Sequence, residues 1–397
     1  MEQVLVYDTT LRDGTQGENI NFSAIDKLKI AKKLDELGVH YIEGGWPGSN
    51  ERDEKFFGMA KSENFQNSRL VAFGATHKHG ITAAEDRHLN AIIESGAPVG
   101  IIFGKTWDLH VKKILNIKPE ENLALIRESV EYLKQHNLET HYDAEHFFDG
   151  YKDNPEYAVE TLKAAVSGGA DVLALCDTNG GTLPHEIEQI MTEVRDALFN
   201  DPDVGKAAAA IRFGIHTHND SGLAVANTIT AVRNGAVIVQ GTINGYGERC
   251  GNADLTAIIP IVQLKMGHPC IGEENIKKLR KASLYVSETA NMQPIHSRPF
   301  VGKSAFAHKG GIHVNAIMKE PRAYEHMDPT LVGNERRVLV SDMAGKSNVE
   351  YKAREMGIDI NSNGVSTSDI VAEVKRLEQE GYQFDVADGT FKILMEK

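Results

Sequence analysis

The sequence has few cysteines, no long apolar run and no excess of basic residues. Its 397 residues include only Cys176, Cys250 and Cys270, which form no C-x-x-C pair, so a disulfide framework is excluded and a reducing compartment is indicated. No apolar stretch approaches the length that crosses a bilayer, and no basic patch with an apolar segment follows Met1. We therefore expect a cytoplasmic protein without a signal peptide or a membrane partner.

Acidic residues outnumber basic ones, and the formal net charge is −13. A nucleic-acid-binding protein would carry a basic face, so nucleic acid is not an expected partner. An anionic substrate would need local positive charge or a metal ion, because the overall field repels it. Apolar residues make up 41% and charged residues 25% of the chain, as in ordinary globular proteins. The length allows one large domain and a smaller one.

A short apolar strand, a loop and an amphipathic helix recur through most of the chain. The first helix illustrates the pattern, since Ser23 and Asp26 have the spacing of a capping box and Gly38 ends the run. Eight such units predict an α/β fold, a (β/α)8 TIM barrel. The alternative is a doubly wound open sheet, but no G-x-G-x-x-G follows the first strand and the strand count suits closure. The strands are expected at residues 4–7, 41–44, 70–74, 99–103, 140–144, 172–176, 212–216 and 237–243.

The pattern changes after the barrel units, where a smaller, mainly helical accessory region is expected. We assign residues 1–275 to the barrel, 276–345 to a linker or lid, and 346–397 to a helical subdomain. Helices are expected at 275–290 and 366–380. The final residues continue an apolar helical pattern without a terminator, so we expect that a C-terminal domain has been removed.

Candidate metal ligands occur at the ends of three predicted strands. His216 and His218 are two residues apart, so both rings project to the same side of the seventh strand. In a closed barrel they can converge with Asp13 from the first strand. A His-x-His pair alone is often mere packing, but this convergence favours a site for Mn²⁺, Mg²⁺ or catalytic Zn²⁺. Asn252, in a glycine-rich loop after the eighth strand, can reach the metal directly or through a water, or simply cap a turn.

Other polar residues at strand ends are candidates for substrate contact. Arg12, beside Asp13, can stabilise negative charge that develops on a substrate oxygen. Asp143 and Glu145 point the same way from the fifth strand, which is costly unless they are paired or functional. Thr178 can bind a substrate carboxylate. Cys176 is interpreted as a small core residue, since nothing nearby activates it.

Three further histidines lie in loops. His77 and His79 flank Lys78 near a glycine, which indicates a solvated loop with a surface or substrate-contact role. In the lid region His313 follows a pair of glycines, and Tyr324 comes later in the same region. Histidine is the natural general acid or base near neutral pH, although a lone loop histidine is usually structural.

Taken together, the motifs resemble those of the DRE-type TIM-barrel metallolyases, a family of acyltransferases and lyases that includes 2-isopropylmalate, homocitrate and citramalate synthases. The resemblance covers residues 4 to about 345, and its opening motifs are most similar to the citramalate synthase branch. The motifs are Leu11-Arg12-Asp13-Gly14, His216-Thr217-His218-Asn219-Asp220, Gly247-Glu248-Arg249-Cys250-Gly251-Asn252 and His308-Lys309-Gly310-Gly311-Ile312-His313.

The resemblance implies a metal-dependent Claisen-type condensation of acetyl-CoA with a 2-oxo acid, in the nearest branch pyruvate, on a route to isoleucine. It implies a divalent metal on Asp13, His216 and His218, with acetyl-CoA as co-substrate, and a homodimer. The roles it implies are catalytic for Arg12, Glu145, His313 and Tyr324, substrate-binding for Thr178, Gln16 and Asp143, and metal-binding for Asn252 as a further ligand.

Three alternatives remain open at this point. The first keeps the chemistry but takes a larger oxo acid, as 2-isopropylmalate and homocitrate synthases do. The second is aldol cleavage, as in hydroxymethylglutaryl-CoA lyase, which needs no added oxo acid. The third is a barrel that only binds or regulates, which the complete ligand set with Arg12 disfavours.

Overall fold

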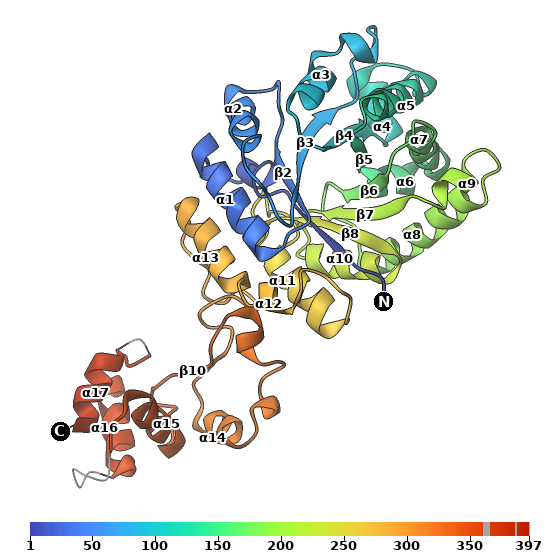
Figure 1. Cartoon of the computed structure of the whole chain (residues 1–397). Helices are drawn as coiled ribbons and strands as arrows, with labels where there is room; N and C mark the ends of the chain where they lie inside the picture. Colours follow the sequence, from blue (N-terminus) through green and yellow to red (C-terminus); the bar gives the residue numbers. More distant parts are fainter. Residues whose placement is uncertain (360–365, 386, 397) are drawn as a thin grey trace. The chain divides into compact units, whose positions relative to one another are not determined.

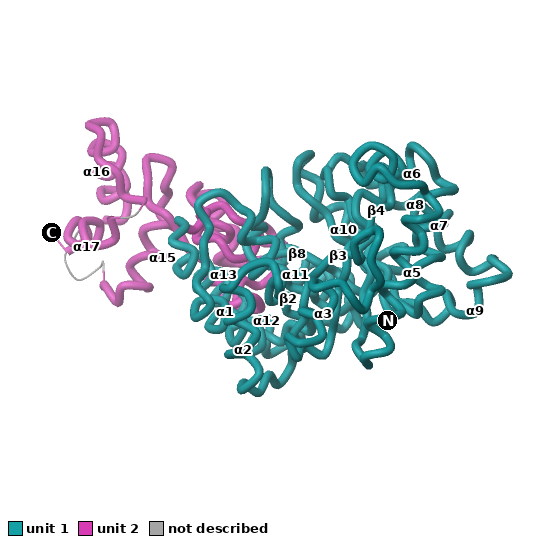
Figure 2. The backbone as a smooth tube through the Cα atoms, turned by 90° about the horizontal axis from the view of Figure 1, so that it is seen from above, with its two compact units in different colours: residues 1–293 teal, residues 294–397 magenta. Residues whose placement is uncertain are grey.

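The computed structural model describes residues 1–359, 366–385 and 387–396. It divides into two compact units, Met1–Gln293 (unit 1) and Pro294–Lys397 (unit 2), which Figure 2 shows in different colours. The expected separation of residues 276–345 from residues 346–397 stays a prediction. No helix in the described part of the chain is long and apolar enough to cross a membrane.

Unit 1 is a closed barrel of eight parallel strands that are surrounded by helices (Figure 1). The strands pair in sequence order, and β8 closes the barrel by pairing with β1 through Leu5↔Ile238 to Asp8↔Gly241. The expected (β/α)8 barrel is therefore confirmed. The strands are β1 (Leu5–Asp8), β2 (Tyr41–Gly45), β3 (Arg69–Ala75), β4 (Val99–Lys105), β5 (Glu139–Glu145), β6 (Val172–Asp177), β7 (Arg212–Thr217) and β8 (Ala236–Gly241).

The barrel interior is packed with side chains rather than open. One buried cluster joins aromatic and branched residues from six of the eight strands, as the layered filling of such barrels requires. Its members are Tyr7, Tyr41, Val71, Phe73, Val99, Ile101, Val172 and Ile238. The interior is therefore a packed core.

The helices of unit 1 follow the strands in the expected alternation. Ser23 and Asp26 form the predicted capping box of the first helix, and Gly38 ends it with φ +89°, a conformation that favours glycine. The single helix expected at 275–290 is instead interrupted, because Lys278 N donates to the Asn275 carbonyl in a tight turn. The helices are α1 (Ala24–Leu37), α2 (Glu51–Ala60), α3 (Arg87–Glu94), α4 (Asp108–His110), α5 (Pro119–Gln135), α6 (Phe147–Asp153), α7 (Pro155–Ser167), α8 (Pro184–Phe199), α9 (Gly205–Ala208), α10 (Ala224–Arg233), α11 (Leu255–Pro260), α12 (Glu273–Ile276) and α13 (Leu279–Thr289).

Unit 2 is mainly helical, as the sequence predicts. The helix expected at 366–380 is present as α16, and Ser366 caps it by accepting from the backbone N of Asp369. A buried cluster that includes Val349, Val374 and Phe391 packs three of its helices together. The elements are β9 (Ala307–His308), α14 (Gly311–Lys319), β10 (Arg337–Val338), α15 (Lys346–Met356), α16 (Thr367–Gln379) and α17 (Asp388–Glu396).

Candidate metal centre and active site

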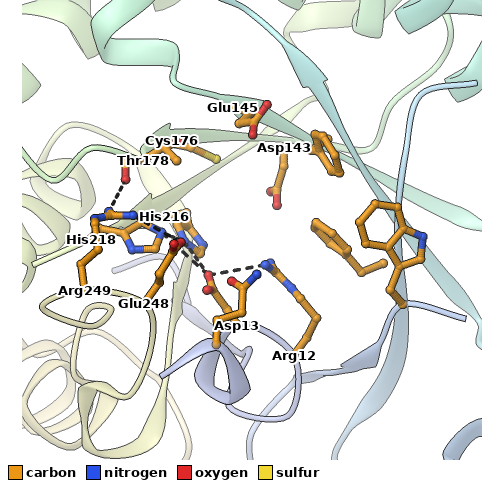
Figure 3. Close-up of a pocket in the computed structure, with 14 residues that line it drawn as sticks. Arg12, Asp13, Asp143, Glu145, Cys176, Thr178, His216, His218, Glu248 and Arg249 are labelled. Atoms are coloured by element: carbon orange, nitrogen blue, oxygen red, sulfur yellow. Dashed lines mark hydrogen bonds and ion pairs between the residues drawn. The ribbon is translucent and has the colours of Figure 1, made fainter. Parts of the chain in front are cut away.

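Three buried side chains converge at the carboxyl ends of β1 and β7, which flank β8. Asp13 opens the short helical turn after β1, while His216 is the last but one residue of β7 and His218 directly follows the strand. The Asp13 Oδ2 atom lies 3.2 Å from Nε2 of His216 and 3.9 Å from Nε2 of His218. The two imidazole Nε2 atoms are 3.3 Å apart. Figure 3 shows Asp13 between the histidines and Arg12.

Two of these three distances are those between ligands of one divalent cation, and the third, between Asp13 and His218, is longer at 3.9 Å. Ligands about 2.1 Å from one ion lie about 3.0–3.4 Å from each other in octahedral or tetrahedral geometry. The second oxygen of Asp13, Oδ1, is buried and has no hydrogen-bond partner in the described structure. Burial lowers the pKa of His218 to about 4, so its ring is neutral at pH 7, which is the form that binds metal. The residues therefore fit the metal that the sequence predicts.

Asn252 lies beside this triad. Its backbone forms an isolated bridge with His218, and its side chain is buried. The amide nitrogen donates to the carbonyl of Tyr246 at 3.2 Å, while the amide oxygen is buried without a partner. An unpaired buried oxygen is costly, and a cation or its water would satisfy it.

Gln240, on β8, orients the His216 ring, and sequence reasoning missed it. The register sets Gln240 directly opposite His216. Its side-chain nitrogen donates to Asp143 at 3.0 Å, so its oxygen faces Nδ1 of His216 at 2.8 Å. An amide oxygen only accepts, and Nδ1 therefore carries the proton. Nε2 is left with the lone pair that a metal needs.

Arg12 is held from inside the barrel by Glu43, which sequence reasoning also missed. The fully buried Glu43 carboxylate accepts from Nε of Arg12, from the Tyr7 hydroxyl at 2.5 Å and from the Thr9 hydroxyl at 2.7 Å. The Arg12 guanidinium also lies 3.8 Å from the Phe73 ring centre. The sequence signal for Glu43 is a carboxylate inside a short apolar strand, β2. A charge at such a position is expected to be buried and therefore to need a partner.

Arg12 and Asp13 each stabilise the charged form of the other. Burial would raise the pKa of Asp13, but Arg12 at 3.6 Å and the two histidines hold it well below its usual range. Burial would lower the pKa of Arg12, but Glu43 and Asp13 raise it. Asp13 is therefore ionised and Arg12 charged throughout the physiological pH range.

A pocket of about 250 Å³ opens over these groups and collects most of the predicted site residues (Figure 3). Gln16, Asp143, Glu145 and Thr178 line it together with Arg12 and the triad. One wall is aromatic. The lining residues are Arg12, Asp13, Gln16, Trp46, Phe73, Phe103, Asp143, Glu145, Cys176, Thr178, His216, His218, Glu248 and Arg249.

The polar lining residues differ in their partners. Burial raises the pKa of Asp143 to about 6, so this carboxyl titrates near neutrality. Glu145 forms an ion pair with Lys105 at the mouth of the barrel. The Thr178 hydroxyl accepts from the backbone N of His146 at 2.9 Å, which fixes its position. Burial raises the pKa of the Cys176 thiol well above its usual value, so it stays protonated.

Three other histidines were singled out in the sequence, and they lie in two different places. His79 is exposed as expected, but the expectation of a solvated position is wrong for His77, which is buried with Nε2 3.3 Å from Glu128 of α5. In unit 2, the exposed rings of His313 and Tyr324 stack with their centres 4.4 Å apart. The catalytic roles expected for these two residues stay predictions.

A closed parallel barrel with two histidines and an aspartate at its carboxyl end defines a metal-dependent TIM-barrel enzyme. The HMGL-like family model matches residues 3–286, and a model described as homocitrate synthase post-HMGL domain-like matches residues 300–382. The chain belongs to the HMGL-like family.

Curated relatives and solved structures agree with this placement. The chain is 52% identical over its whole length to an (R)-citramalate synthase of Geobacter sulfurreducens and 50% identical to one of Aquifex aeolicus, and it spans 73% of the length of each. The crystal structure of the HMG-CoA lyase of Bacillus subtilis superposes with a TM-score of 0.61 at 21% identity. That match covers 75% of this chain and 97% of the lyase, and it supports the fold alone.

Proposed function

We propose that this protein condenses the acetyl group of acetyl-CoA with pyruvate to give (R)-citramalate and CoA. The observation that carries the reaction type is the pocket in which Arg12 lies beside the three converging metal ligands. The choice of substrates rests on relatives about half identical over the whole chain, which are (R)-citramalate synthases. The protein is then an acyltransferase that turns the acyl group into an alkyl group on transfer.

A divalent cation such as Mn²⁺ or Mg²⁺ would be held by Asp13, His216 and His218, with Asn252 as a further ligand. When bound, it supplies Lewis acidity and anchors the oxo acid. Arg12 stabilises the negative charge that forms on the ketone oxygen during attack. Its guanidinium is suited to this because Glu43 fixes it before the substrate arrives. Thr178 and Gln16 border the same pocket and bind the oxo-acid carboxylate.

The first chemical step removes a proton from the acetyl methyl group, which is a very weak acid. Glu145 lies at the mouth, where it pairs with Lys105, and we assign it, together with His313, to this proton transfer. The methyl carbon then forms a bond to the ketone carbon of pyruvate, and the ketone oxygen takes up the electron pair and a proton. Water finally cleaves the thioester, which releases CoA as a thiol and leaves a carboxylate. Tyr324, stacked on His313, orients that ring.

The aromatic wall of the pocket favours a small oxo acid. Trp46 and Phe73 have ring centres 5.5 Å apart, and Phe73 and Phe103 stack at the same distance. These rings line a pocket of only about 250 Å³ beside Arg12. The methyl group of pyruvate can pack against such an apolar wall.

The test measures CoA release from acetyl-CoA with a thiol reagent in the presence of Mn²⁺ or Mg²⁺. Pyruvate, 2-oxobutyrate, 2-oxoisovalerate and 2-oxoglutarate are compared, and the product is identified by chiral chromatography. We expect strong preference for pyruvate and an (R) product. Preference for a larger oxo acid would move the enzyme to another substrate, and cleavage of hydroxymethylglutaryl-CoA without condensation would make it a lyase. We also propose a homodimer, which light scattering on the same sample checks.

A further inference from the structure

Unit 2 contains a second pocket, of about 520 Å³, which is distinct from the barrel site. It lies among α14, the turn that follows it, Arg336 just before β10, and α15. Its volume is in the range of small-molecule sites. The lining residues are Ile317, Met318, Pro321, Arg336, Tyr351, Arg354 and Glu355.

The floor of this pocket is apolar. Ile317 is buried in a small cluster with Val314 and Val338, and Met318 and Tyr351 pack against that cluster while remaining partly exposed. The pocket therefore offers apolar surface to a ligand without exposing the core. A thioether and an aromatic ring adapt readily to an aliphatic chain.

The rim carries one positive charge that no described residue neutralises. Arg336 is paired with the buried Glu325, to which its Nε and Nη2 donate at 2.6 and 2.5 Å. Glu355 is paired with Lys352 at 2.8 Å. The exposed Arg354 guanidinium forms no hydrogen bond or ion pair with any described residue. A ligand in the pocket thus meets a free guanidinium and, on Arg336, the unused donor Nη1.

We propose that this pocket binds a small monocarboxylate with an aliphatic tail, whose carboxylate pairs with Arg354 and Arg336 while its tail lies on Ile317 and Met318. Guanidinium groups bind carboxylates in paired hydrogen bonds, which makes this the matching head group. A phosphate is less suitable, since its additional charge would lie near the Glu355 carboxylate. An amine is disfavoured, because two guanidiniums and only one carboxylate, that of Glu355, line the pocket.

The position of the pocket gives this binding a consequence within unit 2. Met318 belongs to the same helix as His313, and Pro321 starts the turn that leads to Tyr324. Arg336 also holds Glu325, which receives a hydrogen bond from His308 at 3.0 Å. A ligand that fills the pocket therefore contacts, through Met318 and Pro321, both segments that carry the stacked His313–Tyr324 pair. Binding itself does not depend on the proposed reaction, because every lining residue is in unit 2.

The experiment is an NMR titration of the full chain labelled with ¹³C-methyl methionine. The chain has ten methionines, and the Met318 signal is assigned from its loss in Met318→Leu. Hexanoate, hexanol and hexylamine are the probes. We expect hexanoate to shift the Met318 signal saturably, hexanol to shift it only weakly, and hexylamine not to bind. Equal effects of hexanoate and hexylamine, or no saturable shift with hexanoate, would overturn the proposal.

Arg354→Gln removes the free charge, and Arg322→Gln is the matched control, because Arg322 is an exposed arginine of unit 2 outside the pocket. Loss of a charge-assisted hydrogen bond should weaken hexanoate binding at least tenfold in Arg354→Gln. The Arg322→Gln protein should bind as the wild type does. Since both side chains are exposed, both variants are expected to fold, and their CD spectra check this. The same affinity in both variants would refute the assignment of Arg354.

Discussion

Replacing Gln240 with methionine tests the inferred orientation of the metal site without removing a ligand. Methionine has a similar length and no hydrogen-bonding amide. In Gln240→Met, Nδ1 of His216 loses its acceptor and Asp143 loses a donor, both at a fully buried position. The ring of His216 is then free to turn, and its proton is free to move to the nitrogen that should bind the metal.

The expected effect follows from these two lost contacts. Loss of a partner that orients a metal-binding histidine typically lowers metal affinity about 10- to 100-fold. Leaving two buried polar atoms unpaired costs about 1–3 kcal/mol each in the free energy of unfolding. Gln240→Glu retains the acceptor for His216 but brings a second carboxyl group to Asp143. We therefore expect metal affinity near that of the wild type in Gln240→Glu, with Asp143 titrating at higher pH.

The assay is a Mn²⁺ titration followed by EPR of the free ion, with urea unfolding measured on the same samples. Gln189→Met is the control, because Gln189 is an exposed glutamine on α8 whose side chain donates to Glu193, far in the sequence from the metal ligands. Mn²⁺ affinity should fall in Gln240→Met alone. An unchanged Mn²⁺ affinity in a folded Gln240→Met protein would refute the role of Gln240 in orienting His216.

Three further perturbations test other parts of the structure. His216→Ala should abolish Mn²⁺ binding and CoA release together, and retained stoichiometric Mn²⁺ in equilibrium dialysis would contradict the ligand assignment. Arg12→Ala should keep Mn²⁺ bound but lower kcat about 10²- to 10³-fold. Glu43→Gln should lower kcat by up to about 100-fold, because Arg12 is then misplaced. Near-normal kcat in both variants would show that Arg12 does not stabilise the charge on the ketone oxygen. Burial lowers the pKa of His141 to about 3, so between pH 6.5 and 3 the unfolded chain binds a proton that the folded chain excludes, and stability falls as the pH is lowered. From pH 7 to pH 5 this loss is about 2 kcal/mol, and urea unfolding of His141→Gln should lack it; an identical pH dependence in the two proteins would count against this explanation.

The barrel could be predicted because each of its strands has a local sequence pattern. Each strand is a short apolar run followed by a loop and an amphipathic helix, and the expected ranges differ from the observed ones by a few residues at most. The triad could be predicted for a related reason. The carboxyl ends of β1 and β7 lie at the same face of a closed barrel. Asp13 and the two histidines are therefore expected to lie close together.

The partners of the site residues could not be predicted, because they depend on register and on packing across the barrel. Gln240 is significant only because β7 and β8 pair with His216 opposite it. Glu43 meets Arg12 through the interior, and nothing in the local sequence relates the two. The burial of His77 likewise results from packing against α5, which its neighbours Lys78 and Gly80 do not reveal.

The pocket draws its parts from two different arcs of the barrel. The metal ligands and Gln240 come from β1, β7 and β8, whereas the aromatic wall comes from β3, β4 and the residue after β2. The two arcs meet at Arg12, which Glu43 of β2 holds and the Phe73 ring of β3 contacts. The accepted oxo acid can therefore change most readily at Trp46 and Phe103, the members of the aromatic wall away from that contact, while the side chains that form the carbon–carbon bond are inherited unchanged.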